Sequence, residues 1–315
     1  MRIIKSPHIL VTGASGMIGS AFHRNPRHKE FIFVDSRDCD LTDKRQTMEM
    51  FHRHRPSAVI HLAAKVGGLL ANINNMADFY LKNIEMNTNI LEASREHKVT
   101  KVVSLLSTCV YPDECTYPLT EDQIHTGAPH ESNYGYAYAK RMLDVQSRAY
   151  RKQYGCNFIT AIPNNLYGKF DNFDLKESHV IPAMIRKIHA ARDNNANVVL
   201  WGSGSPIREF TYSCDLANIL LFLLDKYNDS DPINVGNTES CTIKELSKII
   251  SEKLGFSGEI VWDKDKPDGQ HKKPSDNSRF ISLGWKQENY TSLHTGLDRV
   301  IDWYERSYPM VRGLN

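Results

Sequence analysis

The stretch His8–Gly19, HILVTGASGMIG, decides the fold. A short apolar run ends at Thr12, and glycines follow at positions 13, 16 and 19. Glycines in a strand-to-helix turn let the backbone approach a pyrophosphate, whose charge the first amides of the helix attract. The spacing is G-x-x-G-x-x-G, which departs from the commoner G-x-G-x-x-G, so the turn alone is weak evidence. Its position between a predicted strand and a predicted helix is what favours a dinucleotide site.

The next predicted strand, Glu30–Val34, ends in Asp35, about 20 residues after Gly13. An acidic residue at this place is the expected partner of a ribose 2′-hydroxyl. Arg37 follows two residues later and can instead pair with a 2′-phosphate. A nicotinamide dinucleotide is therefore the expected cofactor, and these two residues leave NAD against NADP open.

Strands and helices alternate through the rest of the chain. The other predicted strands are Ala58–Leu62, Lys101–Leu106, Phe158–Ile162 and Val198–Trp201, and the main predicted helices are Asp43–Arg53, Met76–His97, Asn133–Tyr154, His179–Arg192, Asp215–Tyr227 and Leu293–Tyr308. Such alternation predicts an α/β fold, a Rossmann-type doubly wound parallel sheet. We expect it in residues 1–170 plus later interleaved segments, with a smaller C-terminal α/β lobe in residues 171–315 that binds substrate. Val66–Asn75 and Pro163–Gly168 are predicted loops.

Composition excludes several classes. The 315 residues carry 39 basic and 37 acidic side chains, a net charge of +2, which argues against a nucleic-acid binder. Six scattered cysteines without a CxxC pair predict reduced thiols, with no disulfide framework and no metal site. The N-terminal residues lead directly into a strand rather than forming a signal peptide, and no apolar run approaches the roughly 20 residues that span a bilayer. A cytoplasmic protein that does not bind a membrane is expected.

The segment Val102–Arg141 carries the candidate chemistry. Tyr136 and Lys140 are four residues apart on a predicted helix and share one face, where the ammonium would lower the pKa of the phenol from about 10. Ser107 ends a predicted strand and can hold the same substrate oxygen. Cys109 would point the same way as Ser107 if the chain stayed extended. This set suits proton transfer at a carbonyl or alcohol while a cofactor moves a hydride.

The chain resembles the extended short-chain dehydrogenase/reductase superfamily and, within it, the GDP-L-fucose synthase family. The segments that carry the likeness are VTGASGMIGSA, HLAAKVGG, LLSTCVYP, TGAPHESNYGYAYAKRMLDVQ, DNF, HVIPAMIRKIH, WGSGSPIREF and KPDGQHKK, which span nearly the whole chain. The resemblance implies 3,5-epimerisation of GDP-4-keto-6-deoxy-D-mannose, followed by NADPH-dependent reduction of its C4 ketone. It implies that Cys109 and His179 are the epimerisation base and acid, and that Ser107, Tyr136 and Lys140 serve the reduction.

The family's binding residues transfer to matching positions. Those expected to bind the cofactor are Gly13, Ser15, Gly16, Met17, Ile18, Gly19, Asp35, Arg37, Leu105, Lys140, Pro163, Asn165, Leu166 and His179. Those expected to bind the nucleotide-sugar are Asn165, Lys187, Trp201, Arg208 and Asp276. A homodimer built from the helices near 76–97 and 133–154 is a family expectation.

Three departures and four alternatives accompany this interpretation. Lys187 stands where relatives usually carry Arg, Asn164 where they often carry Thr, and Lys169 where Pro is common.

One alternative is a reductase, with or without epimerase activity, that acts on another GDP-4-keto sugar such as a deoxyheptose. Sugar-nucleotide 4,6-dehydratases place a carboxylate where this chain has Thr108-Cys109, which disfavours them. A non-catalytic cofactor-binding regulator would tend to lose Tyr136 or Lys140, and both are present. NAD is not excluded as the cofactor.

Overall fold

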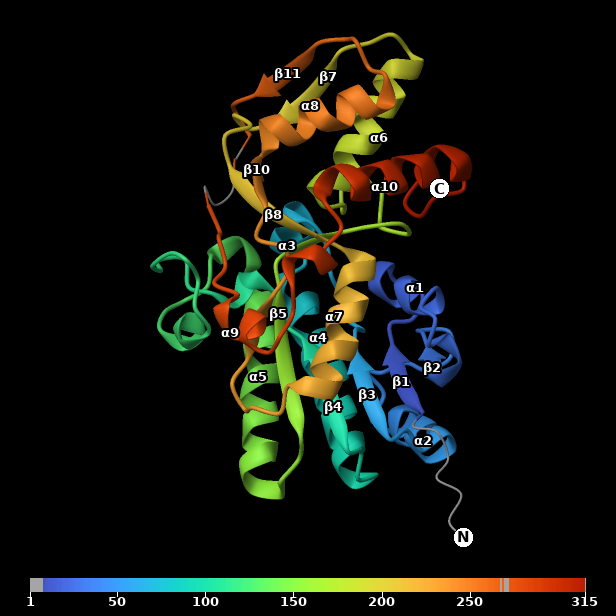
Figure 1. The fold of residues 1–315 in the computed structure, drawn as a ribbon, viewed down its shortest axis with the longest axis vertical. Coiled ribbons are helices and arrows are strands. Elements are labelled where there is room, and N and C mark those ends of the chain that lie inside the picture. The colour runs from blue at the N-terminus through green and yellow to red at the C-terminus, as the bar shows by residue number, and fades with distance from the viewer. Residues whose placement is uncertain (1–7, 267, 269–271, 315) are drawn as a thin grey trace.

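The computed structural model describes residues 8–266, 268 and 272–314. The start of the N-terminal segment and four residues of the KPDGQHKK motif, at positions 267 and 269–271, lie outside these residues. The larger sheet of the molecule has six strands in the order β2-β1-β3-β4-β5-β9 and is parallel throughout (Figure 1). Its strands are β1 (Ile9–Thr12), β2 (Phe31–Val34), β3 (Ala58–His61), β4 (Lys101–Leu105), β5 (Phe158–Pro163) and β9 (Ile233–Val235). The predicted Rossmann-type parallel sheet is confirmed.

Helices cover both faces of this sheet because alternate strand residues point to opposite sides. Ile9 and Val11 pack in one core cluster and Leu10 in another. The first cluster includes α1 (Met17–His23), α7 (Ser213–Lys226) and α9 (Ser278–Ser282), and the second includes α2 (Lys44–His54), α4 (Met76–Glu96) and α5 (Tyr134–Tyr154). The chain order reverses between β1 and β3, so the crevice beyond their carboxyl ends is where a ligand is expected.

The C-terminal lobe stacks against the carboxyl end of the sheet (Figure 1). It has a three-stranded sheet of β10 (Ser240–Thr242), β8 (Ile207–Tyr212) and β6 (Asn165–Tyr167), and a parallel pair of β7 (Val198–Trp201) and β11 (Ile260–Asp263). Its helices α6 (Val180–Asp193), α8 (Ile243–Leu254) and α10 (Leu293–Ser307) share a third apolar cluster with these strands. A capping box between Thr242 and Glu245 starts α8, and Gly255, at φ +66°, ends it.

Several short elements complete the chain. They are α3 (Leu69–Asn74) and the 3₁₀ turns η1 (His28–Glu30), η2 (Thr108–Val110), η3 (Glu121–His125), η4 (Glu131–Asn133) and η5 (Gln287–Asn289). In the described part of the chain, no helix combines the length and apolar character that a membrane crossing would require.

Two predicted loops are wrong in part. The segment 66–75 contains the helix α3, because its Asn72 side chain donates back to the carbonyls of Gly67 and Gly68 and ties the helix to its own entry. The segment 163–168 contains the strand β6, which pairs with β8 from the C-terminal lobe. Both elements depend on partners distant in sequence or on side-chain bonds, which local turn residues do not reveal.

Candidate active site

The glycine turn after β1 is a cradle that side chains would fill. Gly13 has φ +68°, and a Cβ there would lie 2.8 Å from the Ala63 nitrogen. A Cβ at Gly19 would lie 2.4 Å from the carbonyl oxygen of Gly13. No side chain caps the first turn of α1, so the amides of Met17 and its neighbours face outward. The turn that includes Ser15, Ile18 and Gly16 therefore fits the pyrophosphate of a dinucleotide.

A buried chain of hydrogen bonds holds β1 against β3 next to this turn. The Thr12 hydroxyl oxygen accepts from the amides of Leu62 and Ala63, so its proton goes to Nδ1 of His61, 2.8 Å away. His61 Nε2 then donates to Asn87 Oδ1 at 3.0 Å. Burial lowers the pKa of His61 to about 3 and keeps it neutral. The two strand ends that frame the crevice are thus fixed relative to α4.

Ser107 and Cys109 meet through a turn rather than an extended strand. Ser107 has extended backbone angles, and its Oγ accepts from the Cys109 amide at 3.5 Å at the start of η2. The chain does not stay extended after Ser107, because η2 begins directly there, so the condition for period-2 alternation is not met. The structure nevertheless brings the hydroxyl and the thiol together, and both side chains are half-buried.

Tyr136 and Lys140 share one face of α5, as their spacing predicts. The Lys140 ammonium lies 5.8 Å from the centroid of the Tyr136 ring and donates to the carbonyl oxygen of Leu105 at 2.8 Å. Burial lowers the pKa of Lys140 to about 8. Burial also raises the pKa of the Tyr136 phenol above its usual value, with a smaller contribution from Cys109. The expected lowering by Lys140 is wrong for the protein alone, and the phenol is held in its proton-donating form.

Opposing effects act on the Cys109 thiol. Burial raises its pKa, while a hydrogen bond with Ser107 and the charges of Lys273 and Lys140 lower it. The net effect raises the pKa of Cys109. The prediction that this thiol ionises near neutrality is therefore wrong for the protein without ligand. Lys273 is a residue that the sequence reasoning did not assign, although it belongs to the quoted KPDGQHKK segment. Its own pKa is lowered by burial and raised by Cys109.

His179 directly precedes α6, and its side chain is exposed. Desolvation by the surrounding protein lowers the pKa of its imidazole. Contacts connect its segment to the tyrosine: the Gly68 amide donates to the Glu177 carbonyl at 2.7 Å, and the Phe79 ring lies beside both Gly67 and Tyr136. The loop after β3 therefore lies between the start of α6 and α5.

The residues after β5 join the two halves of the molecule. Pro163 ends β5, and the Asn165 side chain donates to the Glu209 carbonyl of β8 at 2.9 Å. Leu166 packs against the core cluster that contains the cofactor-side strands. Asn164 bridges three segments, donating to the Asn237 carbonyl at 2.7 Å and accepting from Thr211 at 2.6 Å.

An exposed tryptophan and several cations gather on the C-terminal lobe. Trp201 ends β7 and is 42% exposed. The ammonium of Lys187 lies 5.6 Å from its ring centroid, and that of Lys266 lies at 5.8 Å. Lys187 also donates to the Val199 carbonyl at 3.0 Å. An aromatic face bordered by ammonium groups suits an anionic ligand that carries a planar base.

Asp268, rather than Asp276, organises the turn after Trp201. Its Oδ1 accepts from the Ser203 amide at 2.6 Å and its Oδ2 from the Ser203 hydroxyl at 2.8 Å. Burial lowers the pKa of Arg208, and the charges of Tyr117 and Asp268 raise it. Asp276 instead accepts from the Ser278 amide at the start of α9. Sequence reasoning missed Asp268, and its place in the KPDG motif was the available signal.

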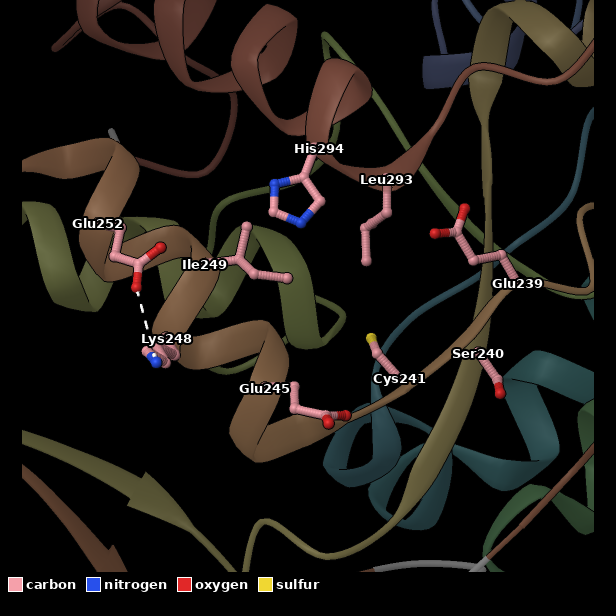
Figure 2. Close-up of a pocket in the computed structure, with 9 residues that line it drawn as sticks. All are labelled: Glu239, Ser240, Cys241, Glu245, Lys248, Ile249, Glu252, Leu293 and His294. Carbon is pink, nitrogen blue, oxygen red and sulfur yellow. Dashed lines mark ion pairs between the residues drawn. The ribbon is translucent and has the colours of Figure 1, made fainter.

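A surface pocket elsewhere on the C-terminal lobe is unrelated to this set. It lies between β10, α8 and the start of α10 (Figure 2). None of the predicted site residues lines it. Its Glu245 belongs to the cap of α8, and Lys248 forms an ion pair with Glu252. The candidate site residues lie instead at the carboxyl end of the parallel sheet and on the neighbouring lobe.

Comparison with known proteins shows the family to which this chain belongs. The NAD dependent epimerase/dehydratase family matches residues 9–236. The chain belongs to this family. Among its members it is 40% identical to a GDP-L-fucose synthase of Dictyostelium discoideum, over 96% of this chain and 97% of the relative.

Two solved structures of the family share the fold over nearly their whole lengths. A GDP-L-fucose synthetase from Naegleria fowleri bound to NADP superposes with a TM-score of 0.92 at 38% identity, covering 99% of this chain and 96% of the other. A GDP-6-OMe-4-keto-L-xylo-heptose reductase from C. jejuni gives 0.89 at 27% identity, covering 96% and 99%. This chain is thus more similar in sequence to the fucose enzyme than to the heptose enzyme.

Proposed function

We propose that this protein is a GDP-L-fucose synthase that uses NADPH. It converts GDP-4-keto-6-deoxy-D-mannose by epimerisation at C3 and C5 and then reduces the C4 ketone to give GDP-L-fucose. The observation that carries the proposal is the pair Ser107 and Cys109 at the carboxyl end of β4, facing the helix that bears Tyr136 and Lys140. The full-length likeness to GDP-L-fucose synthases supports it.

Epimerisation uses the acidity that the C4 ketone gives to its neighbours. The base Cys109 removes the proton from C3 or C5 on one face, and the acid His179 returns a proton to the same carbon on the other face. Lys273 and Lys140 favour the thiolate that this step needs. His179 returns its proton as the imidazolium, and a lowered pKa makes that imidazolium a stronger proton donor.

Reduction adds a hydride to C4 and a proton to the carbonyl oxygen. NADPH supplies the hydride when bound in the crevice at the ends of β1 and β3. Tyr136 donates the proton, and its raised pKa keeps that proton available. Ser107 holds the carbonyl oxygen for transfer. Lys140 has one N–H engaged with Leu105, which leaves two for the nicotinamide ribose.

The C-terminal lobe binds the GDP half of the substrate. Trp201 offers its face to the base, while Arg208 and Lys187 attract the diphosphate, and Asn165 lies between sugar and cofactor. Asp276 stays a prediction as a hydroxyl partner. The chain divides at about residue 170, with later segments returning to the first domain. In this division the first domain binds NADPH and the C-terminal lobe binds the GDP-sugar.

We also propose a cytoplasmic homodimer. Apolar side chains on α4 and α5 support the dimer: Leu81 is 53% exposed, Val145 44% and Met142 36%. Such a surface on two adjacent helices suits self-association through a four-helix interface. Light scattering of the purified chain checks this, because a monomer at micromolar concentration would refute it.

One experiment tests the main proposal. The protein is incubated with GDP-4-keto-6-deoxy-D-mannose and NADPH in deuterated water, and the product is identified by NMR. We expect GDP-L-fucose with deuterium at C3 and C5. A product reduced at C4 without deuterium would favour a reductase on another GDP-4-keto sugar, and no turnover would favour a cofactor-binding regulator.

A further inference from the structure

Glu209 carries a buried carboxylate to which the proposed reaction steps give no role. The residue lies on β8 and is 4% exposed. Its Oε2 accepts from the Ser275 hydroxyl at 2.9 Å, from the Ser275 amide at 3.3 Å and from Asn164 Nδ2 at 3.4 Å. A carboxylate suits this position because it only accepts hydrogen bonds and binds donors more strongly than a neutral amide does. One oxygen thus joins two segments that are distant in the sequence.

The first of these segments is the turn after β5, which carries Asn165. The Asn165 side chain donates to the Glu209 carbonyl at 2.9 Å, while Asn164 donates to its carboxylate. Asn164 is 5% exposed and also accepts from the Thr211 hydroxyl on β8 at 2.6 Å. Glu209 is therefore fixed from the side of β5, and it presents its carboxylate to Ser275 from a defined position.

The second segment, residues 273–276, pairs with Leu119. The Leu119 amide donates to the Pro274 carbonyl at 2.8 Å, and the Leu119 carbonyl accepts from the Asp276 amide at 2.9 Å. Leu119 is 1% exposed and lies in the same apolar cluster as Val110, which directly follows the proposed epimerisation base. The segment is therefore held close to the part of the chain that carries this base.

Lys273 brings a positive charge to the base. It stands two residues before Ser275, and its side chain is half-buried. Its charge lowers the pKa of the Cys109 thiol, and the thiol raises the pKa of the ammonium. A Coulomb interaction weakens as the distance between the charges grows, so its size depends on where the backbone holds Lys273. The two bonds from Ser275 to Glu209 fix that backbone.

We infer that Glu209 is a positioning residue, which acts through Ser275 to hold the Lys273 ammonium beside the Cys109 thiol. The negative charge of Glu209 would by itself raise the pKa of a nearby thiol. Positioning and direct charge therefore predict opposite shifts when the carboxylate is removed. The inference rests on the proposed function, in which Cys109 is the epimerisation base, but ionisation of the thiol is measurable without substrate.

Alkylation of Cys109 by iodoacetamide as a function of pH, followed by mass spectrometry, tests this role in the full chain. Glu209→Gln should slow alkylation at about pH 7.5 by about twofold and move the half-maximal rate to a higher pH. In the Lys273→Gln background the same substitution should have no further effect, because the ammonium that it positions is gone. Ser275→Ala keeps the carboxylate and should cause a smaller shift in the same direction.

Glu239→Gln is the matched control, since it removes an exposed carboxylate from the same lobe and should alkylate like the parent. Thermal melts verify folding, and if Glu209→Gln does not fold, Ser275→Ala decides in both backgrounds. A profile that is unmoved, that moves to lower pH, or that moves equally in the Lys273→Gln background would overturn the positioning role. If the profile shifts as expected while Cys109→Ser still incorporates deuterium at the parent rate, the positioning role holds and the assigned base is wrong.

Discussion

Lys140 is 3% exposed and a strand carbonyl holds its ammonium, whereas Trp201 is 42% exposed and the ammonium groups of two lysines lie over its ring. The first belongs to the edge of the parallel sheet where we propose the catalytic residues, and the second to the surface of the C-terminal lobe that we propose binds the nucleotide. Residues at the sheet edge are positioned by regular backbone and burial, while residues on the lobe are positioned by turns and mutual side-chain contacts. Substitutions should therefore act on the chemical steps in the first region and on substrate affinity in the second.

The largest expected effect separates reduction from epimerisation. Tyr136→Phe removes the proton donor but keeps the ring that contacts Phe79. Reduction should fall by about 10³- to 10⁴-fold, as general acid catalysis is lost. Solvent deuterium should still enter C3 and C5, followed by NMR. Loss of both activities in a folded variant would indicate that the tyrosine is structural.

Cys109→Ser tests the epimerisation step at the same edge of the sheet. Deuterium incorporation at C3 and C5 should fall by about 10²- to 10³-fold, because a serine hydroxyl is a far weaker base than a thiolate. NADPH should bind with its original dissociation constant, which calorimetry measures. Deuterium exchange at the parent rate would contradict the assignment of the base.

The two acids of the C-terminal segment provide a direct contrast. Asp268→Asn replaces the carboxylate that accepts hydrogen bonds from the Ser203 amide and hydroxyl, which weakens the turn after Trp201. KM for the GDP-sugar should therefore rise by about tenfold, with kcat little changed. Asp276→Asn keeps an oxygen acceptor for the Ser278 amide, and KM should stay within about twofold if that is its role. Steady-state kinetics on both variants decides which acid serves the substrate.

The smallest expected effect concerns the charge beside the thiol. Lys273 lowers the pKa of Cys109, so Lys273→Gln raises that pKa and reduces the thiolate fraction at pH 7.5. Alkylation of Cys109 by iodoacetamide, followed by mass spectrometry, should slow by about threefold and reach its half-maximal rate at a higher pH. Lys272→Gln, at the exposed neighbouring position, should alkylate like the parent. A profile unmoved by Lys273→Gln would refute the coupling.

The same contrast explains what the sequence could predict. The sheet, its order of elements and the pairing of Tyr136 with Lys140 follow from periodicity and spacing, which are local properties. The turn η2 after Ser107 and the strand β6 are decided by tertiary partners, and so is the balance of burial against charge at Cys109. The KPDG motif could draw attention to Asp268, but its hydrogen bond with Ser203 is seen only in the folded turn. Sequence patterns therefore predict the backbone elements better than they predict side-chain contacts and protonation.

The late return of the chain to the first core constrains how the protein is made. β9 pairs with β5 at the edge of the parallel sheet, and α7, α9 and Trp285 complete the cluster around β1. A nascent chain that has emerged only as far as β5 exposes one apolar face of that sheet until residues beyond 285 are synthesised. At about 5–20 residues per second, the roughly 120 residues between β5 and Trp285 take about 6 to 24 seconds. Chaperone contacts should therefore concentrate on this face, and a nonsense codon between β5 and β9 should yield an insoluble fragment rather than a working half.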